Sequence, residues 1–176
     1  EVGGTRAPHV LATRGVLIGG DDLDRRIMQS LLPYFGKDAK VDGGADFPPD
    51  FLDQLQAWQT MPELSRPEPL SKIRHFQKTS DQPQAMRALE TLVTQNVGFQ
   101  LFRQIEHTKR DLTDALMSQL EFDFEHIAIH ERLLRRDFET LIEGERLAVE
   151  REIHNVLADA ALGADQVGVV LRTGGT

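Results

Sequence analysis

The chain has 176 residues, of which 40% are apolar, so it is long enough to bury one hydrophobic core. Its 28 acidic and 20 basic side chains leave a net charge of −8, which argues against a general nucleic-acid-binding protein because such a protein needs a basic face. The sequence has no cysteine, which excludes disulfides and fits a cytoplasmic protein, and it has no apolar run of about 18 residues that would span a membrane.

The first part of the chain is predicted to form short strands followed by an amphipathic helix. Apolar residues at 10–12 and 16–18 flank an Arg-Gly pair, which is typical of two strands joined by a turn. The Gly-Gly-Asp-Asp run at 19–22 then opens a helix, because acids in a first turn suit the helix dipole. Pro33 is expected to kink this helix or end it early, and Gly36 is a natural stop.

Residues 36–84 differ in character, because glycines and prolines break them into short pieces. Short helices are predicted at 51–58 and 70–76. We expect this segment to be an insertion or a lid whose core holds Trp58 and the nearby phenylalanines.

The second half of the chain changes its hydrophobic period twice. A helical pattern runs from about 84 to 117, with Gly98 as a candidate break. Residues 120–130 alternate between apolar and polar side chains, which predicts a β-hairpin or meander with one buried face. The helical period then returns as far as Gly163, the expected C-cap, and a buried parallel strand is predicted at 167–171.

Four side chains of the predicted 84–117 helix form the candidate functional face: Glu106, Lys109, Arg110 and Thr113. Their spacing of i, i+3, i+4 and i+7 predicts that they lie on one side of the helix. One acid, two bases and a hydroxyl on one face suit the sugar and the base of a nucleotide. The same spacing also describes a solvated helix face whose charges pair with each other, and the residues alone leave both interpretations open.

Three motifs follow one another along the chain, with a hairpin, an amphipathic helix and a strand predicted between the second and the third. They read Gly-Gly-Asp-Asp-Leu-Asp at 19–24, Glu-x-x-Lys-Arg-x-Leu-Thr at 106–113, and Gly174, Gly175 and Thr176 at the end. This succession resembles the second half of the ATPase domain of the DnaK-type heat-shock chaperones, which belong to the actin-like ATPase superfamily. Members typically read Gly-Gly-Glu-Asp-Phe-Asp, Glu-x-x-Lys-Arg-x-Leu-Ser and Gly-Gly-Ser-x-Arg at these places.

The resemblance implies a helix-rich α+β chain that is part of an actin-like ATPase fold. Residues 19–134 would form its mobile upper lobe, with helices, a small antiparallel sheet and the 36–84 insertion. Residues 1–18 would supply strands, and residues 135–176 a helix and a strand, to the lower ribonuclease-H-like lobe. The chain would then be a piece of a longer cytoplasmic protein that binds ATP or ADP with Mg²⁺.

The resemblance also implies roles for the candidate residues. Glu106 and Lys109 would hold the ribose hydroxyls. Arg110 would stack on the adenine plane, and Thr113 would offer its hydroxyl to the base. The three residues at 174–176 would bring backbone close to the nucleotide. Catalytic and metal-binding residues would lie upstream of the chain, so the chain alone is not expected to hydrolyse ATP.

The gap between the first glycine pair and Glu106 is longer than in standard family members, which is similar to the YegD-like branch of these chaperones. A client-binding domain need not be present in that branch. The protein partner that the resemblance allows is a co-chaperone or a client, and neither nucleic acid nor a membrane is expected. Two alternatives stay open. One is a helical protein-interaction module that binds through residues 36–84 and keeps a vestigial nucleotide face. The other is a sugar kinase of the same superfamily, although such kinases do not usually carry the Glu-x-x-Lys-Arg helix.

Overall fold

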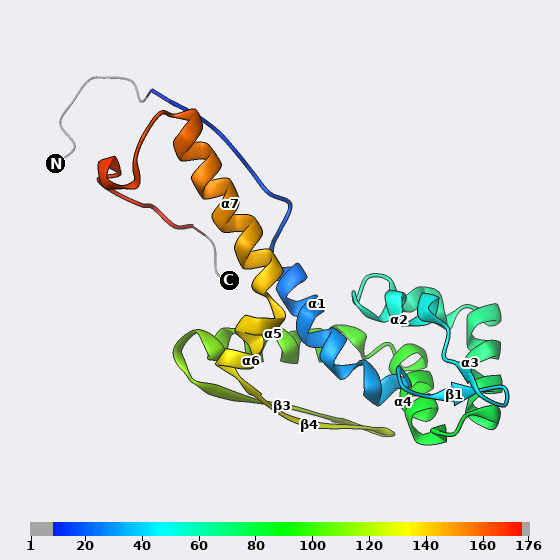
Figure 1. Ribbon diagram of the computed structural model, residues 1–176. Coiled ribbons are helices and arrows are strands. Elements are labelled where there is room, and N and C mark those ends of the chain that lie inside the picture. Colours follow the sequence, from blue (N-terminus) through cyan, green and yellow to red (C-terminus); the bar gives the residue numbers. More distant parts are fainter. Residues whose placement is uncertain (1–8, 174–176) are drawn as a thin grey trace. The chain divides into compact units, whose positions relative to one another are not determined.

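The computed structural model describes residues 9–173, and Figure 1 shows its helices and strands. The described residues are helix-rich and contain two antiparallel sheets of two strands each, which confirms the expected α+β class. The chain divides into two compact units. We call Gly20–Ile142 the central unit, and Glu1–Gly19 together with Glu143–Thr176 the terminal unit.

The central unit begins with helix α1 (Gly20–Leu31), which runs into a short 3-10 helix (Leu32–Phe35). Pro33 lies in the first turn of the 3-10 helix, so the predicted early end of the helix is confirmed. Gly36 then closes the segment with a φ of 95°, and its backbone N–H donates to the Leu32 carbonyl. A Cβ at Gly36 would also displace the flexible end of the Met86 side chain, but the positive φ is the main reason why this position favours glycine.

Short elements fill the segment that follows: β1 (Lys40–Val41), β2 (Ala45–Asp46), α2 (Pro49–Leu55), a 3-10 helix (Met61–Ser65) and α3 (Pro67–Thr79). The two predicted short helices are therefore present as α2 and α3, with shifted ends. The phenylalanines form the expected aromatic core, since the rings of Phe47, Phe51 and Phe76 meet edge to face at 5.6–5.9 Å. The expectation for Trp58 is wrong, because this residue lies beyond the end of α2, is 41% exposed and packs against Phe99.

The long helical pattern forms two helices, α4 (Pro83–Thr94) and α5 (Gly98–Asp114). The chain turns at Asn96, whose φ is 53°, so the candidate break at Gly98 is confirmed within two residues. Gly98 opens α5 against Met61, and an added side chain there would overlap the Met61 sulfur. The absence of a side chain at Gly98 therefore allows the start of α5 to lie close to Met61 in the second 3-10 helix.

The predicted hairpin is confirmed as β3 (Met117–Phe124) and β4 (Ile127–Leu134), which pair antiparallel with Phe122 opposite Ile129. Along it, Leu120, Ile127 and Ile129 are buried and Phe122 and Phe124 are partly buried against the core, whereas the alternating positions Glu121, Asp123, Ala128 and His130 are exposed. Strand β3 packs on α5, and helix α6 (Arg135–Leu141) follows β4 within the same unit. Figure 1 shows the hairpin, in yellow-green, below α5.

The terminal unit contains α7 (Glu143–Asp159) and a short 3-10 helix (Ala164–Gln166). The expected strands at 10–12, 16–18 and 167–171 are wrong, since the described residues there form no strand. A strand needs a neighbour for its backbone hydrogen bonds, and the described part of this unit offers none. The C-cap of α7 is also not Gly163. Ala161 takes the left-handed conformation instead, with a φ of 54°.

The terminal unit is joined internally by Arg14, which donates two hydrogen bonds to the carboxylate of Asp159 at 2.6 and 3.1 Å. Within residues 9–173 no helix combines the length and the apolar character needed to cross a membrane.

Candidate functional site

Helix α5 carries the four residues predicted to share one face, and it places three of them outward. Arg110 and Thr113 are exposed and Glu106 is partly exposed, whereas only 5% of Lys109 is exposed. On a helix, position 109 lies about 60° round from position 106, next to the stripe that holds Ile105. That stripe is buried, so the prediction of a single four-residue face is wrong for Lys109 and fits the other three.

The Lys109 side chain is held by the first turns of α1. Its Nζ lies 2.8 Å from Oδ1 of Asp24 and donates to the Gly20 carbonyl at 3.2 Å. The two charged side chains are only 6% and 9% exposed. Lys109 therefore joins α5 to α1, and a ribose contact by its ammonium would require this ion pair to open.

Burial raises the pKa of the Asp24 carboxyl above its ordinary value, and the hydrogen bond and charge of Lys109 lower it only in part. The negative charges of Glu106 and Asp21 add to the rise. Both charges lose hydration when they are buried, so a pair of this kind is weak evidence for added stability, and its clear effect is to hold Lys109 and Asp24 in one relative position.

Glu106 and Arg110 form a second ion pair on α5, with 2.8 Å between Oε1 and Nη2. Their side chains are 41% and 58% exposed, unlike those of the buried pair. Exposed pairs of this spacing are worth only about 0.3–0.5 kcal/mol, so a ligand can separate these two groups easily. An acceptor and a planar cation are thus available on the open side of the helix.

A wide, shallow hollow of about 900 Å³ lies between α5 and the start of β3. Most of the residues that line it have polar side chains, and the lining consists of Gln104, His107, Arg110, Asp111, Asp114, Ala115, Met117, Ser118 and Gln119. Two of these residues are joined by a hydrogen bond, which Ser118 Oγ donates to Asp111 at 3.0 Å. Arg110 is the member of the predicted face that reaches it. No sequence motif predicted this hollow, although the i, i+4, i+7 spacing of His107, Asp111 and Asp114 indicates a polar stripe on this side of the helix.

Arg135, at the start of α6, holds the end of α5. Its Nε donates to the Leu112 and Ala115 carbonyls at 2.8 and 3.1 Å, and its Nη2 donates to the Thr113 carbonyl at 3.0 Å. These carbonyls end the helix and have no partner within it. The guanidinium therefore fixes the turn that presents Thr113, and no sequence motif predicted this contact.

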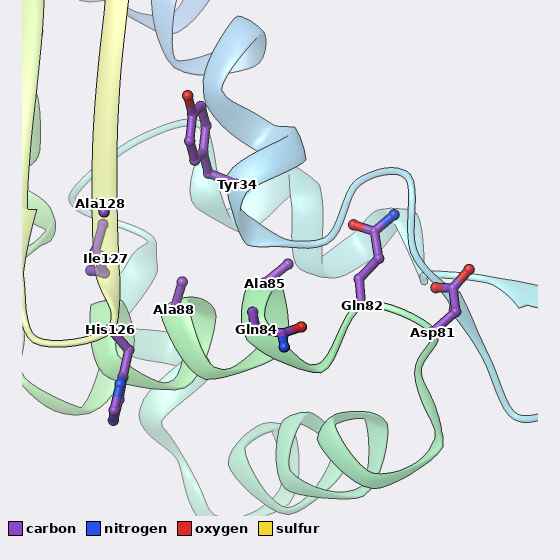
Figure 2. Close-up of a pocket in the computed structure, with 9 residues that line it drawn as sticks. All are labelled: Tyr34, Asp81, Gln82, Gln84, Ala85, Ala88, His126, Ile127 and Ala128. Carbon is purple, nitrogen blue, oxygen red and sulfur yellow. The ribbon is translucent and has the colours of Figure 1, made fainter.

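A smaller hollow of about 390 Å³ lies between Tyr34, the start of α4 and the start of β4. Figure 2 shows Ala85 and Ala88 on α4 near Ile127 and Ala128 on β4, with Tyr34 above them. The Tyr34 hydroxyl donates to Glu131 at 2.8 Å, and this hydrogen bond raises the pKa of the phenol. The hydroxyl of Tyr34, which lines this hollow, therefore already has a hydrogen-bond partner within the protein.

Two further points concern a possible metal site and the glycine motif at the end of the chain. Within residues 9–173 no three His, Cys, Asp or Glu side chains come together in a way that would hold a metal ion. Gly174, Gly175 and Thr176 lie outside the described residues, so their predicted approach to a nucleotide stays a prediction.

No protein-family model matches the chain, and no curated protein sequence matches it. A function for this chain therefore has to be argued from the arrangement of its side chains.

Proposed function

We propose that this chain is the adenosine-contacting lobe of a DnaK-like ATPase with an actin-like fold, and that Glu106, Arg110 and Thr113 contact the nucleoside. The observation that carries the proposal is that these three side chains are exposed or partly exposed on one side of α5, with Arg110 among the residues that line the wide hollow beside β3. The order of the three motifs along the chain supports the same assignment.

The chemistry of the face suits a nucleoside. The Arg110 guanidinium is planar and weakly hydrated, so it stacks well on a base. Once the Glu106–Arg110 pair opens, the Glu106 carboxylate is free to accept hydrogen bonds from ribose hydroxyls, and the Thr113 hydroxyl can donate or accept. Lys109 is not part of this contact set, because its ammonium is committed to Asp24 and Gly20.

In this proposal the central unit holds the upper mobile lobe, and the longer protein binds ATP or ADP with Mg²⁺ and acts as a cytoplasmic chaperone. The described residues do not fit a magnesium site, since they bring no cluster of carboxylates or histidines together. We therefore assign them no part in phosphate chemistry. Because they supply only part of the contacts, the affinity of this chain for ATP is expected to be weak.

The test is the affinity for ATP of the wild type and of Arg110→Glu, Thr113→Val and Arg103→Glu, measured by ligand-observed NMR. The first two variants are expected to lose binding, since each removes a group of the contact face. Arg103 is an exposed arginine two turns earlier on the same helix, about 10 Å away, and provides the matched charge control. Equal binding by all four proteins would reject the proposal.

A second candidate function is a protein-interaction module, and the aromatic pair of Trp58 and Phe99 favours it. The two rings meet at 5.3 Å while Trp58 stays 41% and Phe99 51% exposed. Exposed aromatic side chains of this kind often dominate protein interfaces. Under this alternative Arg110→Glu leaves the activity of the longer protein unchanged, whereas Trp58→Ala abolishes it.

A further inference from the structure

We propose that Asp24 is a positioning residue for the adenosine face, and that Lys109 acts through Asp24 and does not touch the nucleotide. The inference rests on the proposed function and assigns Lys109 a different role from the ribose contact that the sequence resemblance implies. It starts from the two contacts of the Lys109 ammonium, one with Asp24 and one with the Gly20 carbonyl.

These contacts bridge the first turns of α1 from a single point on α5. Gly20 and Asp24 are four residues apart, so both face the same side of α1. Lys109 lies at the border between the buried stripe of α5 and its exposed side. A fixed ammonium at this border sets the rotation of α5 and thereby determines which way Glu106 and Arg110 point.

Lys109 is not free to leave this position. Apart from its ion pair with Nζ, Oδ1 of Asp24 has no hydrogen-bond partner among the described residues, and the carboxylate is almost fully buried. Withdrawal of the ammonium toward a ligand would leave this charge buried without a cation, which is strongly unfavourable. The other two charges that shift the pKa of Asp24, those of Glu106 and Asp21, are negative and disfavour its ionised form further.

The exposed pair of Glu106 and Arg110 on the same helix differs from the buried pair of Asp24 and Lys109. Glu106 and Arg110 can separate at little cost and contact a ligand, whereas Asp24 and Lys109 stay closed. One helix thus carries a contact pair and a positioning pair.

The test compares Lys109→Met with the double variant Asp24→Leu/Lys109→Met, using ATP affinity at a temperature where circular dichroism shows each protein folded. Lys109→Met leaves Asp24 without its cation and is expected to weaken binding about tenfold. The double variant replaces the ion pair by an apolar pair of similar size and is expected to regain the wild-type affinity within about twofold. Lys72→Met, which opens the exposed pair with Glu68, is the control and is expected to change nothing.

Equal loss of affinity in the single and the double variant would show that Lys109 touches the nucleotide and would overturn the inference. An unchanged affinity in Lys109→Met would overturn it as well.

A second measurement does not depend on ATP binding. Chemical acetylation of lysines, read by mass spectrometry, is expected to be slow at Lys109 in the wild type and fast in Asp24→Asn, and to stay slow when ATP is added. Fast acetylation in the wild type would overturn the closed pair. A wild type that does not bind ATP would instead reject the proposed function, and the acetylation rates would still show whether the pair is closed.

Discussion

The central and the terminal unit both carry apolar patterns in the sequence, but they bury their apolar side chains to very different extents. Every apolar side chain that is buried in the described residues belongs to the central unit, from Ile27 to Phe138. Helix α7 of the terminal unit buries no side chain, and Leu147, Val149 and Ile153 are 39–54% exposed. An apolar pattern therefore indicates where a chain will bury surface only if the partner surface is present.

Of the residues proposed to contact the nucleotide, those on α5 are described by the structure and those at 174–176 are not. The face on α5 is built within the central unit, where the Arg135 contacts and the Asp24–Lys109 pair hold the helix. The glycine motif at 174–176 lies outside the described residues, so its contact with a nucleotide stays a prediction. The part of the site on α5 is thus the part on which experiments with this chain can act.

The largest contrast is expected from isoleucine truncation in the two units. Ile105 on α5 is fully buried, so Ile105→Ala should lower the free energy of unfolding by about 3 kcal/mol through lost burial and a cavity. Ile153 on α7 is 54% exposed, and Ile153→Ala should change it by less than about 1 kcal/mol. Urea denaturation measures both. Equal losses would show that α7 is packed in solution and would remove the contrast.

A smaller contrast is expected from glycine replacement. Gly36→Ala should destabilise the central unit by about 2 kcal/mol, because φ is 95° there and the new methyl meets Met86. Gly144 lies in α7 with open space around it, so Gly144→Ala should stabilise that helix by about 0.5 kcal/mol. Thermal unfolding followed by circular dichroism compares the two. A stabilising Gly36→Ala would show that the turn after the first 3-10 helix is not as described.

The smallest contrast concerns two aspartates whose pKa values shift in opposite directions. Burial raises the pKa of Asp24, with Lys109, Glu106 and Asp21 as the charged groups around it. The contribution of this shift to stability is therefore present below the ordinary value of 3.8 and is lost as the pH rises through the raised pKa. The stability of the wild type relative to Asp24→Asn should fall as the pH rises from below 3.8 toward neutrality.

Asp159 of the terminal unit should show the opposite sign. Its hydrogen bond with Arg14 lowers the pKa, so this contribution is present above 3.8 and is lost as the pH falls through the lowered pKa. Relative to Asp159→Asn, the wild type should gain stability as the pH rises. Both differences come from urea denaturation at a series of pH values. A common sign for the two aspartates would contradict the burial of Asp24 or the Arg14 contact.

Local signals in the sequence predicted the parts of the fold that depend on local chemistry. Alternation alone predicted the hairpin of β3 and β4, and Pro33 predicted where α1 ends. The strands at 10–12, 16–18 and 167–171 were wrong because strand formation depends on a neighbour that a short apolar run does not reveal. The expectation for Trp58 failed for a related reason, since its packing partner Phe99 lies on α5 and is distant in the sequence.

For the candidate site, too, the sequence predicted only the features that local spacing determines. Helical spacing identified α5 and the outward positions of Glu106, Arg110 and Thr113. It could not place Lys109, because its partner Asp24 is distant in the sequence and spacing does not show which side of a helix is buried. The contacts of Arg135 with the end of α5 and the hollow beside β3 likewise arise only from tertiary packing.

The most direct test of whether the exposed side of α5 contacts adenosine is a residue-resolved ¹⁵N NMR titration of the whole chain with ATP. We expect the amide shifts to concentrate on α5 around Glu106, Arg110 and Thr113 and along the β3 side of the hollow, and to vanish in Arg110→Glu. Shifts that avoid α5, or that persist unchanged in Arg110→Glu, would contradict the claim that this face contacts adenosine.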